Sequence, residues 1–225
     1  MQRGGSAIQN DFDRIAQALD RGADFDYLQP WERALLTRLP KRYDRVLDVG
    51  CGHGALTRAL ADRADSVIAL DVSPAMIHVA RKHSLGRHNI EYVRADVLAY
   101  ELPEAMFDIV VCVATLHHLP FTSTVHRLAN AVRPGGLLLI QDVVTRTGLR
   151  YVPTNALAWI TRCLRSGWSD LGAEVTALYR EHGRDEIYLT PAEASIAFAN
   201  VLPGASVEQH LEWRYTAVWH CAPAT

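Results

Sequence analysis

Residues 45–54 read RVLDVGCGHG, from Arg45 to Gly54. The segment begins as an apolar run with β-branched residues and ends in three alternating glycines. A helical pattern follows at once, with apolar residues at positions 55, 56, 59 and 60. This order predicts a strand, a glycine-rich turn and a helix. Glycine has no Cβ, so such a turn at the carboxyl end of a parallel strand lets a ligand lie against the backbone.

Two classes of cofactor use a turn of this kind. Gly50, Gly52 and Ala55 fit G-x-G-x-x-A, the fingerprint of a dinucleotide site, in which a pyrophosphate lies on the helix N-terminus. Asp48, two positions before the first glycine, would repel a pyrophosphate but would suit an ammonium group. Together with Gly54, it favours S-adenosylmethionine, which carries a cationic amino-acid tail, a sulfonium and no phosphate. The turn by itself leaves both cofactors open.

The composition is that of one globular domain. The chain has 225 residues, of which 49% are hydrophobic and 21% charged, with a net charge of −2. The absence of a basic tract argues against a nucleic-acid substrate. We find no secretory signal or membrane-spanning run, and the four cysteines are scattered, so we expect a cytoplasmic protein. Neither a monomer nor a homodimer is favoured.

The pattern after the glycine turn alternates strands and helices, which predicts a doubly wound, mostly parallel α/β sheet. Further strands are expected at Ser66–Leu70, Ile90–Arg94, Phe107–Val113 and Leu137–Ile140, the last after a turn at 133–136. Asp71 follows the second strand about twenty residues after the turn, where an acid can bind both ribose hydroxyls. Asp96 and Val97 follow the third strand and suit an adenine amine and ring, although an acid at the position of Asp96, taken alone, is more often a cap or turn residue.

The remaining segments are expected to surround this core. We divide the chain into N-terminal helices (1–40), a cofactor-binding core (41–142), a helical substrate-lid insertion (143–203) and a terminal β-hairpin (204–225). Aromatic residues in the helical segments are candidates for contact with a flat or apolar acceptor, although such residues more often pack in cores. The candidates are Tyr27, Trp31, Tyr151 and Trp159.

Four motifs, in order, resemble class I S-adenosylmethionine-dependent methyltransferases of the small-molecule type 11 or type 12. They are VLDVGCGHG, IALDVSPAMI, VRADVLAYELPEAMFDIVVCVATLHHL and LANAVRPGGLLLIQDV, and they span about Arg45 to Asp142. The resemblance implies a seven-stranded Rossmann-like sheet with an antiparallel last strand. It also implies cofactor contacts at Asp48, Gly50, Gly52, Gly54, Asp71, Val72, Met76, Asp96, Val97, Val113 and Ala114. The segments expected to determine substrate specificity resemble the family least, so the resemblance does not identify the methyl acceptor.

Methyl transfer from a sulfonium is an in-line displacement, so the protein mainly aligns the reactants and excludes water. A base is needed only when the acceptor must lose a proton. His117 and His118, which follow the fourth strand, are the candidate bases. Adjacent residues do not point the same way, so we expect at most one of them to face the substrate; the other reading is that one caps a helix or packs. Tyr151, Asp142 and His182 are weaker candidates.

No metal site is predicted, because the sequence has no H-x-x-x-H or H-E-x-x-H pattern and no carboxylate cluster near the fifth strand. The leading hypothesis is therefore a methyltransferase acting on O, N or C of a small molecule. One alternative is an NAD-type oxidoreductase built on the same turn. The other is a non-catalytic or repurposed S-adenosylmethionine-binding protein, because the chemistry needs few dedicated side chains.

Overall fold

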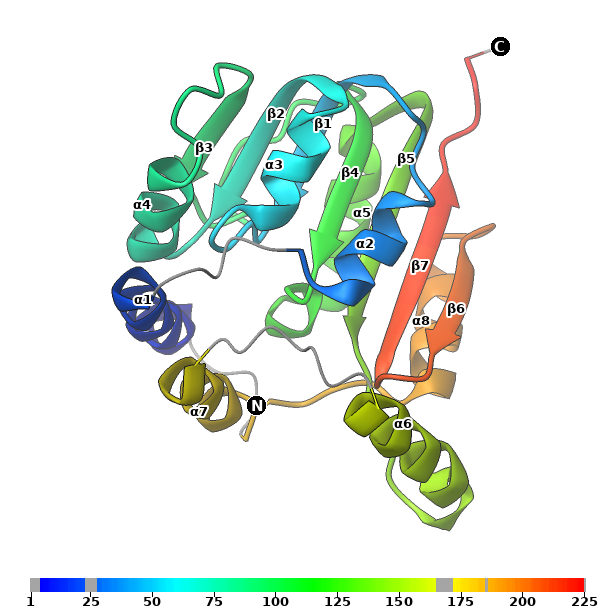
Figure 1. The fold of residues 1–225 in the computed structure, drawn as a ribbon. Helices are drawn as coiled ribbons and strands as arrows, with labels where there is room; N and C mark the ends of the chain where they lie inside the picture. The colour runs from blue at the N-terminus through cyan, green and yellow to red at the C-terminus, as the bar shows by residue number, and fades with distance from the viewer. Residues whose placement is uncertain (1–4, 23–27, 165–171, 185, 225) are drawn as a thin grey trace.

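The computed structural model describes residues 5–22, 28–164, 172–184 and 186–224, with 150 and 162–164 described by their backbone alone. Its centre is a seven-stranded sheet in the order β3-β2-β1-β4-β5-β7-β6 (Figure 1). The first five strands are mutually parallel, and β7 is antiparallel to β5 and β6. The strands are β1 Tyr43–Val49, β2 Ala64–Asp71, β3 Ile90–Arg94, β4 Phe107–Val113, β5 Val132–Val143, β6 Ser206–His210 and β7 Arg214–His220. The expected doubly wound fold with an antiparallel last strand is confirmed.

The central strands are apolar on both faces because helices cover both sides of the sheet. Six of the seven residues of β4 are buried, and the strand pairs with β1 from Val46↔Ile109 to Val49↔Cys112. The helices are α1 Gly5–Arg21, α2 Pro30–Leu36, α3 Ala55–Ala61, α4 Pro74–Lys82, α5 Phe121–Ala131, α6 Val152–Leu164, α7 Gly172–His182 and α8 Pro191–Val201, with short 3-10 helices η1 Leu116–His118 and η2 Leu149–Tyr151.

Separate apolar clusters fill the two sides of the sheet. On one side, Leu35 of α2 and Leu60 of α3 pack with Val46 of β1. On the other side, Leu128 of α5 and Phe198 of α8 pack with the opposite face of the central strands. The helix α8 falls within the segment 143–203 that we expected to form a lid, yet its Phe198 is only 1% exposed. This part of the segment therefore contributes to the main core.

The strand β5 is longer than expected. The turn predicted at 133–136 is wrong, since β5 runs without a break from Val132 to Val143. The pairing with β4 shifts register between Phe107 and Ile109, which accommodates the glycines inside the strand. Gly135 has a φ of 77°, and its N–H donates to the carbonyl of Cys221 at 3.1 Å. The glycines thus form an irregular segment of β5, which is hydrogen-bonded to the residues that follow β7.

The helices α1 and α7 lie side by side beyond the carboxyl ends of the parallel strands (Figure 1). Two exposed ion pairs join them: Arg14 to Glu181 at 3.2 Å and Arg21 to Glu174 at 2.6 Å. The helix α7 comes from the segment 143–203 that we expected to form a lid, and α1 comes from the expected N-terminal helices. None of the described helices is long and apolar enough to cross a membrane.

Candidate active site

The glycine turn after β1 has left-handed backbone at all three of its glycines. Their φ angles are 73° at Gly50, 52° at Gly52 and 81° at Gly54. A Cβ on Gly50 would lie 2.0 Å from Oγ1 of Thr115, and one on Gly54 would lie 2.5 Å from the hydroxyl of Tyr92. A Cβ on Gly52 would meet nothing within 4 Å. Protein packing therefore requires Gly50 and Gly54, whereas Gly52 faces open space where a ligand can approach.

Asp71, at the end of β2, holds the glycine turn. Its Oδ2 accepts the N–H of Gly52 at 2.9 Å, and its Oδ1 accepts the N–H of Ser73 at 2.8 Å. Burial raises the pKa of Asp71 from its ordinary 3.8 to about 6, although both N–H bonds act in the opposite direction. A carboxylate with further lone pairs at this position can accept hydrogen bonds from a diol.

Asp48 lies beneath the turn and is 1% exposed. The hydroxyl of Thr57 donates to its Oδ2 at 2.6 Å. Burial raises the pKa of Asp48 to about 7, opposed by the Thr57 bond and reinforced by the nearby Glu32 and Asp71. No cationic partner of Asp48 is found among the described residues, and a bound ammonium group would favour its ionised form.

The other predicted cofactor residues lie along the same edge of the sheet. Asp96 is exposed, and its Oδ1 accepts the N–H of Leu98 at 2.9 Å, while Val97 is buried. Asp96 is thus a turn residue, as the alternative reading held, with its second oxygen still able to accept from a ligand. Ala114 has a φ of 50°, an unusual conformation for a non-glycine residue directly after β4.

Val72 and Met76 differ in their surroundings. Val72 is partly buried after β2, where it follows Asp71. Met76 is 1% exposed and packs with Ile15 of α1 and Val175 of α7. Val113 is partly buried, and its carbonyl accepts from the hydroxyl of Thr115 at 2.9 Å. Cofactor contacts of these side chains and of the Ala114 backbone remain predictions.

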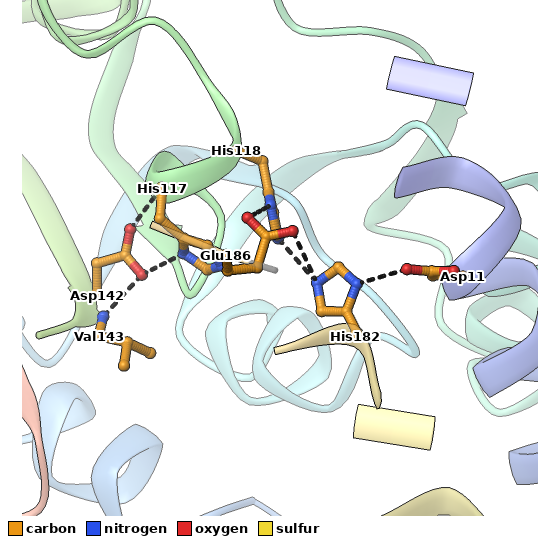
Figure 2. Close-up of polar contacts among 7 residues, drawn as sticks. All are labelled: Asp11, His117, His118, Asp142, Val143, His182 and Glu186. Carbon is orange, nitrogen blue, oxygen red and sulfur yellow. Dashed lines mark hydrogen bonds and ion pairs between the residues drawn. The ribbon is translucent and has the colours of Figure 1, made fainter. Parts of the chain in front are cut away.

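His117 in η1 is paired with Asp142 at the end of β5. Its Nδ1 lies 2.7 Å from Oδ1 of Asp142, and its backbone N–H donates to Oδ2 at 2.8 Å (Figure 2). The side chains are 9% and 2% exposed. This double contact fixes the imidazole with Nδ1 toward the carboxylate, so that a neutral ring carries its lone pair on Nε2.

His118 lies in the same cluster. The two rings of His117 and His118 lie together, with centroids 3.8 Å apart, and the expectation that at most one of them faces the substrate remains a prediction. The tight 3-10 turn of η1, and not a strand or α-helix, carries them. His182 at the end of α7 places its Nε2 3.3 Å from Nε2 of His118. Asp11 of α1 and Glu186 complete the group shown in Figure 2.

The predicted acceptor-contact residues are more scattered. Tyr27 lies outside the described residues. The guanidinium of Arg214 lies 4.2 Å from the ring centroid of Trp31, which places Trp31 near the junction of β5 and β7. Tyr151 is partly buried in η2, and Trp159 is 64% exposed on α6. An acceptor role for these aromatic residues remains a prediction.

The fold and this edge of the sheet can be compared with known proteins. The model of the family described as "Methyltransferase domain" matches residues 46–136. An uncharacterized methyltransferase of Mycobacterium tuberculosis (strain ATCC 25618 / H37Rv) is 31% identical over 204 residues, which cover 85% of this chain and 97% of the relative. The chain belongs to the methyltransferase family. The resemblance to class I S-adenosylmethionine-dependent methyltransferases is confirmed, and S-adenosylmethionine is the cofactor of that class.

Two further comparisons bear on this methyltransferase. The ubiquinone biosynthesis O-methyltransferase of Pseudomonas fluorescens (strain Pf0-1) is 41% identical over 103 residues, 44% of each chain. A solved structure described as a DhpI-SAM-HEP complex is 22% identical, with a TM-score of 0.64, over 97% of this chain and 98% of that one. The second likeness shows the shared fold. Family membership decides against the NAD-type oxidoreductase.

The structure adds residues that the sequence analysis did not select. Thr57 binds Asp48, and Thr115 fills the space beside Gly50. Asp13 of α1 accepts a hydrogen bond from Ser73 at 2.6 Å, which ties α1 to the loop after Asp71. Asp11 and Glu186 face the histidines. An acid close to a histidine in space but distant in sequence leaves no local pattern to detect.

Proposed function

We propose that this methyltransferase transfers the methyl group of S-adenosylmethionine to an oxygen of a small, anionic or weakly acidic molecule. The observation that carries this proposal is the His117–Asp142 pair beside the glycine turn, with Nδ1 and Oδ1 2.7 Å apart. Thr115 packs beside Gly50 of the turn and directly precedes η1, which carries His117. The imidazole of His117 therefore lies close to the proposed cofactor-binding turn. A histidine fixed through Nδ1 can accept an acceptor proton at Nε2.

The cofactor would be held by groups on three neighbouring loops. The proposed contacts are Asp48 to the ammonium, Asp71 to the ribose hydroxyls and Asp96 with Val97 to the adenine. The open space at Gly52 leaves room for a ligand against the turn, and the buried carboxyl of Asp48 is a suitable partner for an ammonium group. The neighbouring structure with 22% identity is described with SAM bound.

The reaction would proceed by in-line displacement. The acceptor oxygen attacks the methyl carbon, the bond from carbon to sulfur breaks, and neutral S-adenosylhomocysteine leaves with the bonding electrons. The hydroxyl proton passes to Nε2 of His117, while Asp142 stabilises the resulting imidazolium. A carboxylate acceptor would already be ionised and would require no base. The partial likeness to an O-methyltransferase supports oxygen over nitrogen or carbon as the acceptor atom.

Arg214 supports an acceptor that carries negative charge. It begins β7 opposite Val143, at the same edge of the sheet as Asp142. Its Nη1 is buried without a hydrogen-bond partner among the described residues. Burial lowers the pKa of Arg214, and Asp142 and Glu32 act in the opposite direction. A buried guanidinium donor next to an aromatic ring is suited to a carboxylate or a phenolate.

The test is methyl transfer from labelled S-adenosylmethionine to matched acceptors. We would compare aromatic hydroxyacids, simple phenols, aliphatic carboxylic acids and primary amines of similar size. Methylation of acids or phenols, with amines inert and Arg214→Gln raising KM for anionic acceptors, supports the proposal. Preferential methylation of the amines contradicts it. Cofactor binding without transfer to any acceptor points to the non-catalytic alternative.

A further inference from the structure

Three histidines from two distant parts of the chain converge at the edge of the sheet. His117 and His118 come from η1, and His182 ends α7. Each offers one ring nitrogen, and these nitrogens lie within 4.8 Å of one another. Figure 2 shows His118 and His182 in contact with each other and with Glu186, and His117 lies beside His118. The cluster therefore has a composition and a compactness that are typical of metal sites.

Each of these histidines has a carboxylate at its Nδ1. Asp142 lies 2.7 Å from Nδ1 of His117, Glu186 lies 3.3 Å from Nδ1 of His118, and Asp11 lies 2.9 Å from Nδ1 of His182. Metal-bound histidines usually donate their second ring N–H to a carboxylate or carbonyl, which fixes the tautomer and raises the basicity of the other nitrogen. The hydrogen bonds of His117 to Asp142 and of His182 to Asp11 leave Nε2 as the ligand atom of these two rings. Glu186 lies within ion-pair distance of Nδ1 of His118 and of Nε2 of His182, the latter at 3.9 Å, and so lies beside the proposed ion.

The contact between His118 and His182 has a geometry that a shared ion could use. Their Nε2 atoms are 3.3 Å apart, so without an ion one ring N–H donates to the nitrogen of the other ring. A divalent cation can take the place of this hydrogen bond by accepting a lone pair from each ring, with His117 as the third ligand.

We propose that His117, His118 and His182 bind one divalent transition-metal ion of the zinc type through their Nε2 atoms. Ligand atoms about 2.0–2.1 Å from a tetrahedral ion lie roughly 3.3 Å from one another. The His118–His182 separation of 3.3 Å has this value. A small rotation of His117 would complete the set. Imidazole ligands select zinc, cobalt, nickel or iron over magnesium.

Three histidine ligands leave the fourth tetrahedral position for an exchangeable ligand. The acceptor oxygen is the natural occupant, since a metal-bound hydroxyl loses its proton near neutral pH. The inference thus deepens the proposed function, on which its catalytic part rests. In the loaded protein the ion would lower the pKa of the acceptor hydroxyl, whose proton would leave to solvent, because His117 would then be a ligand and not the base. Phe12, 4.8 Å from the His182 ring by centroid, shields the site on the α1 side.

The ion would also join parts of the molecule that the chain itself connects only distantly. Two ligands belong to the core, the third belongs to α7, and Asp11 belongs to α1. Binding would therefore require the arrangement in which α1 and α7 cover the edge of the sheet. We expect metal to raise thermal stability and to slow amide hydrogen exchange in α7.

The first experiment measures binding without cofactor or acceptor. Protein without an affinity tag is stripped of metal with a chelator and titrated with Co²⁺, followed by visible absorption and elemental analysis. We expect one ion per chain, with the intense absorption of four-coordinate cobalt, and displacement by Zn²⁺ but not by Mg²⁺. Absence of stoichiometric binding to the wild-type protein overturns the site, whatever the variants do.

The variants test which residues bind the ion. His182→Ala should weaken Co²⁺ binding at least about tenfold, and Asp11→Asn should weaken it by roughly 10- to 100-fold. His88→Ala, an exposed histidine before β3, should bind as the wild type does. Equal affinity of His182→Ala and the wild type overturns the assignment. Asp11→Asn keeps the side-chain volume and so provides the same test if His182→Ala does not fold.

Activity then separates the two proposals. If both are right, chelator-treated protein loses turnover with hydroxyl acceptors and regains it with Zn²⁺ or Co²⁺. Metal binding without transfer to any acceptor contradicts the proposed function and supports the site. Chelator-insensitive methyl transfer by protein that binds no metal contradicts the site alone and leaves His117 as the base.

Discussion

The backbone N–H of Gly52 donates to Oδ2 of Asp71 across 2.9 Å, joining the turn after β1 to the end of β2. The same carboxylate also accepts the N–H of Ser73. Asp71 therefore fixes the shape of the turn in addition to its proposed contact with the ribose. The sequence predicted for this acid at the end of a strand only a role in binding the ligand.

Replacing Asp71 should impair both binding and stability. Asp71→Ala leaves two backbone donors without their acceptor, which costs about 1–3 kcal/mol each when such groups are buried. We expect a lower free energy of unfolding and at least a tenfold loss of S-adenosylhomocysteine affinity by calorimetry. Asp65→Ala on the same strand, an exposed residue, is the control and should change stability by less than about 0.5 kcal/mol. Unchanged cofactor affinity in Asp71→Ala would refute the ribose assignment.

Two neighbouring glycines should respond differently to alanine. Gly50→Ala places a methyl group 2.0 Å from Oγ1 of Thr115, so we expect a loss of more than about 3 kcal/mol or failure to fold. Gly52→Ala meets no atom within 4 Å and should cost only about 1–2 kcal/mol, from its left-handed backbone. Its main effect should be on cofactor affinity. Denaturant unfolding and calorimetry on both variants separate these effects, and a folded Gly52→Ala with normal affinity would contradict ligand approach at that position.

Asp48 should make the free protein less stable as the pH rises. The unfolded carboxyl ionises near 3.8 and the folded one near 7, so stability falls between these values and the cost is complete above about pH 7. Asp48→Asn removes this cost, which is on the order of 4 kcal/mol. We expect the variant to be more stable than the wild type at about pH 8 and similar to it at about pH 4, by urea unfolding without cofactor.

The same titration should affect cofactor binding in the opposite sense. Below about pH 7 the carboxyl of Asp48 is protonated. The affinity of the wild-type protein for S-adenosylmethionine should therefore decrease as the pH is lowered through about 7. Asp48→Asn should bind weakly at every pH. Asp44→Asn, an exposed residue at the start of β1, should follow the wild type. A wild-type affinity that is independent of pH would contradict a direct ammonium partnership for Asp48.

Asp142→Asn should reduce turnover far more than cofactor affinity. The amide NH₂ facing Nδ1 of His117 would favour the tautomer with a proton on Nε2, which can neither accept a proton nor bind a metal. We expect turnover with hydroxyl acceptors to fall about 10²-fold or more, with S-adenosylmethionine affinity within about threefold. His126→Ala on α5 serves as the control. Parallel losses in turnover and cofactor affinity would indicate that Asp142 only supports the structure.

The sequence by itself determined the parallel sheet, the glycine turn and the acids at the strand ends. These features are local: β-branched apolar runs form buried strands, glycines permit left-handed turns, and an acid directly after a parallel strand falls at the ligand-binding edge. Four strands of the core and the terminal hairpin follow from such patterns within a few residues. The irregular start of β5 did not follow, because Pro134 and two glycines read as a turn until pairing with β4 and β7 is known.

Only the tertiary structure brought His182 to His118, 64 residues away, and Asp11 to His182, 171 residues away. No periodic pattern in the sequence predicts these contacts, because they arise from the packing of α1 and α7 over the edge of the sheet. The sequence therefore showed two adjacent histidines and no metal pattern. Packing added a third imidazole, His182, and placed carboxylates from other segments beside the rings, since a buried polar group is stable only where another segment supplies its partner.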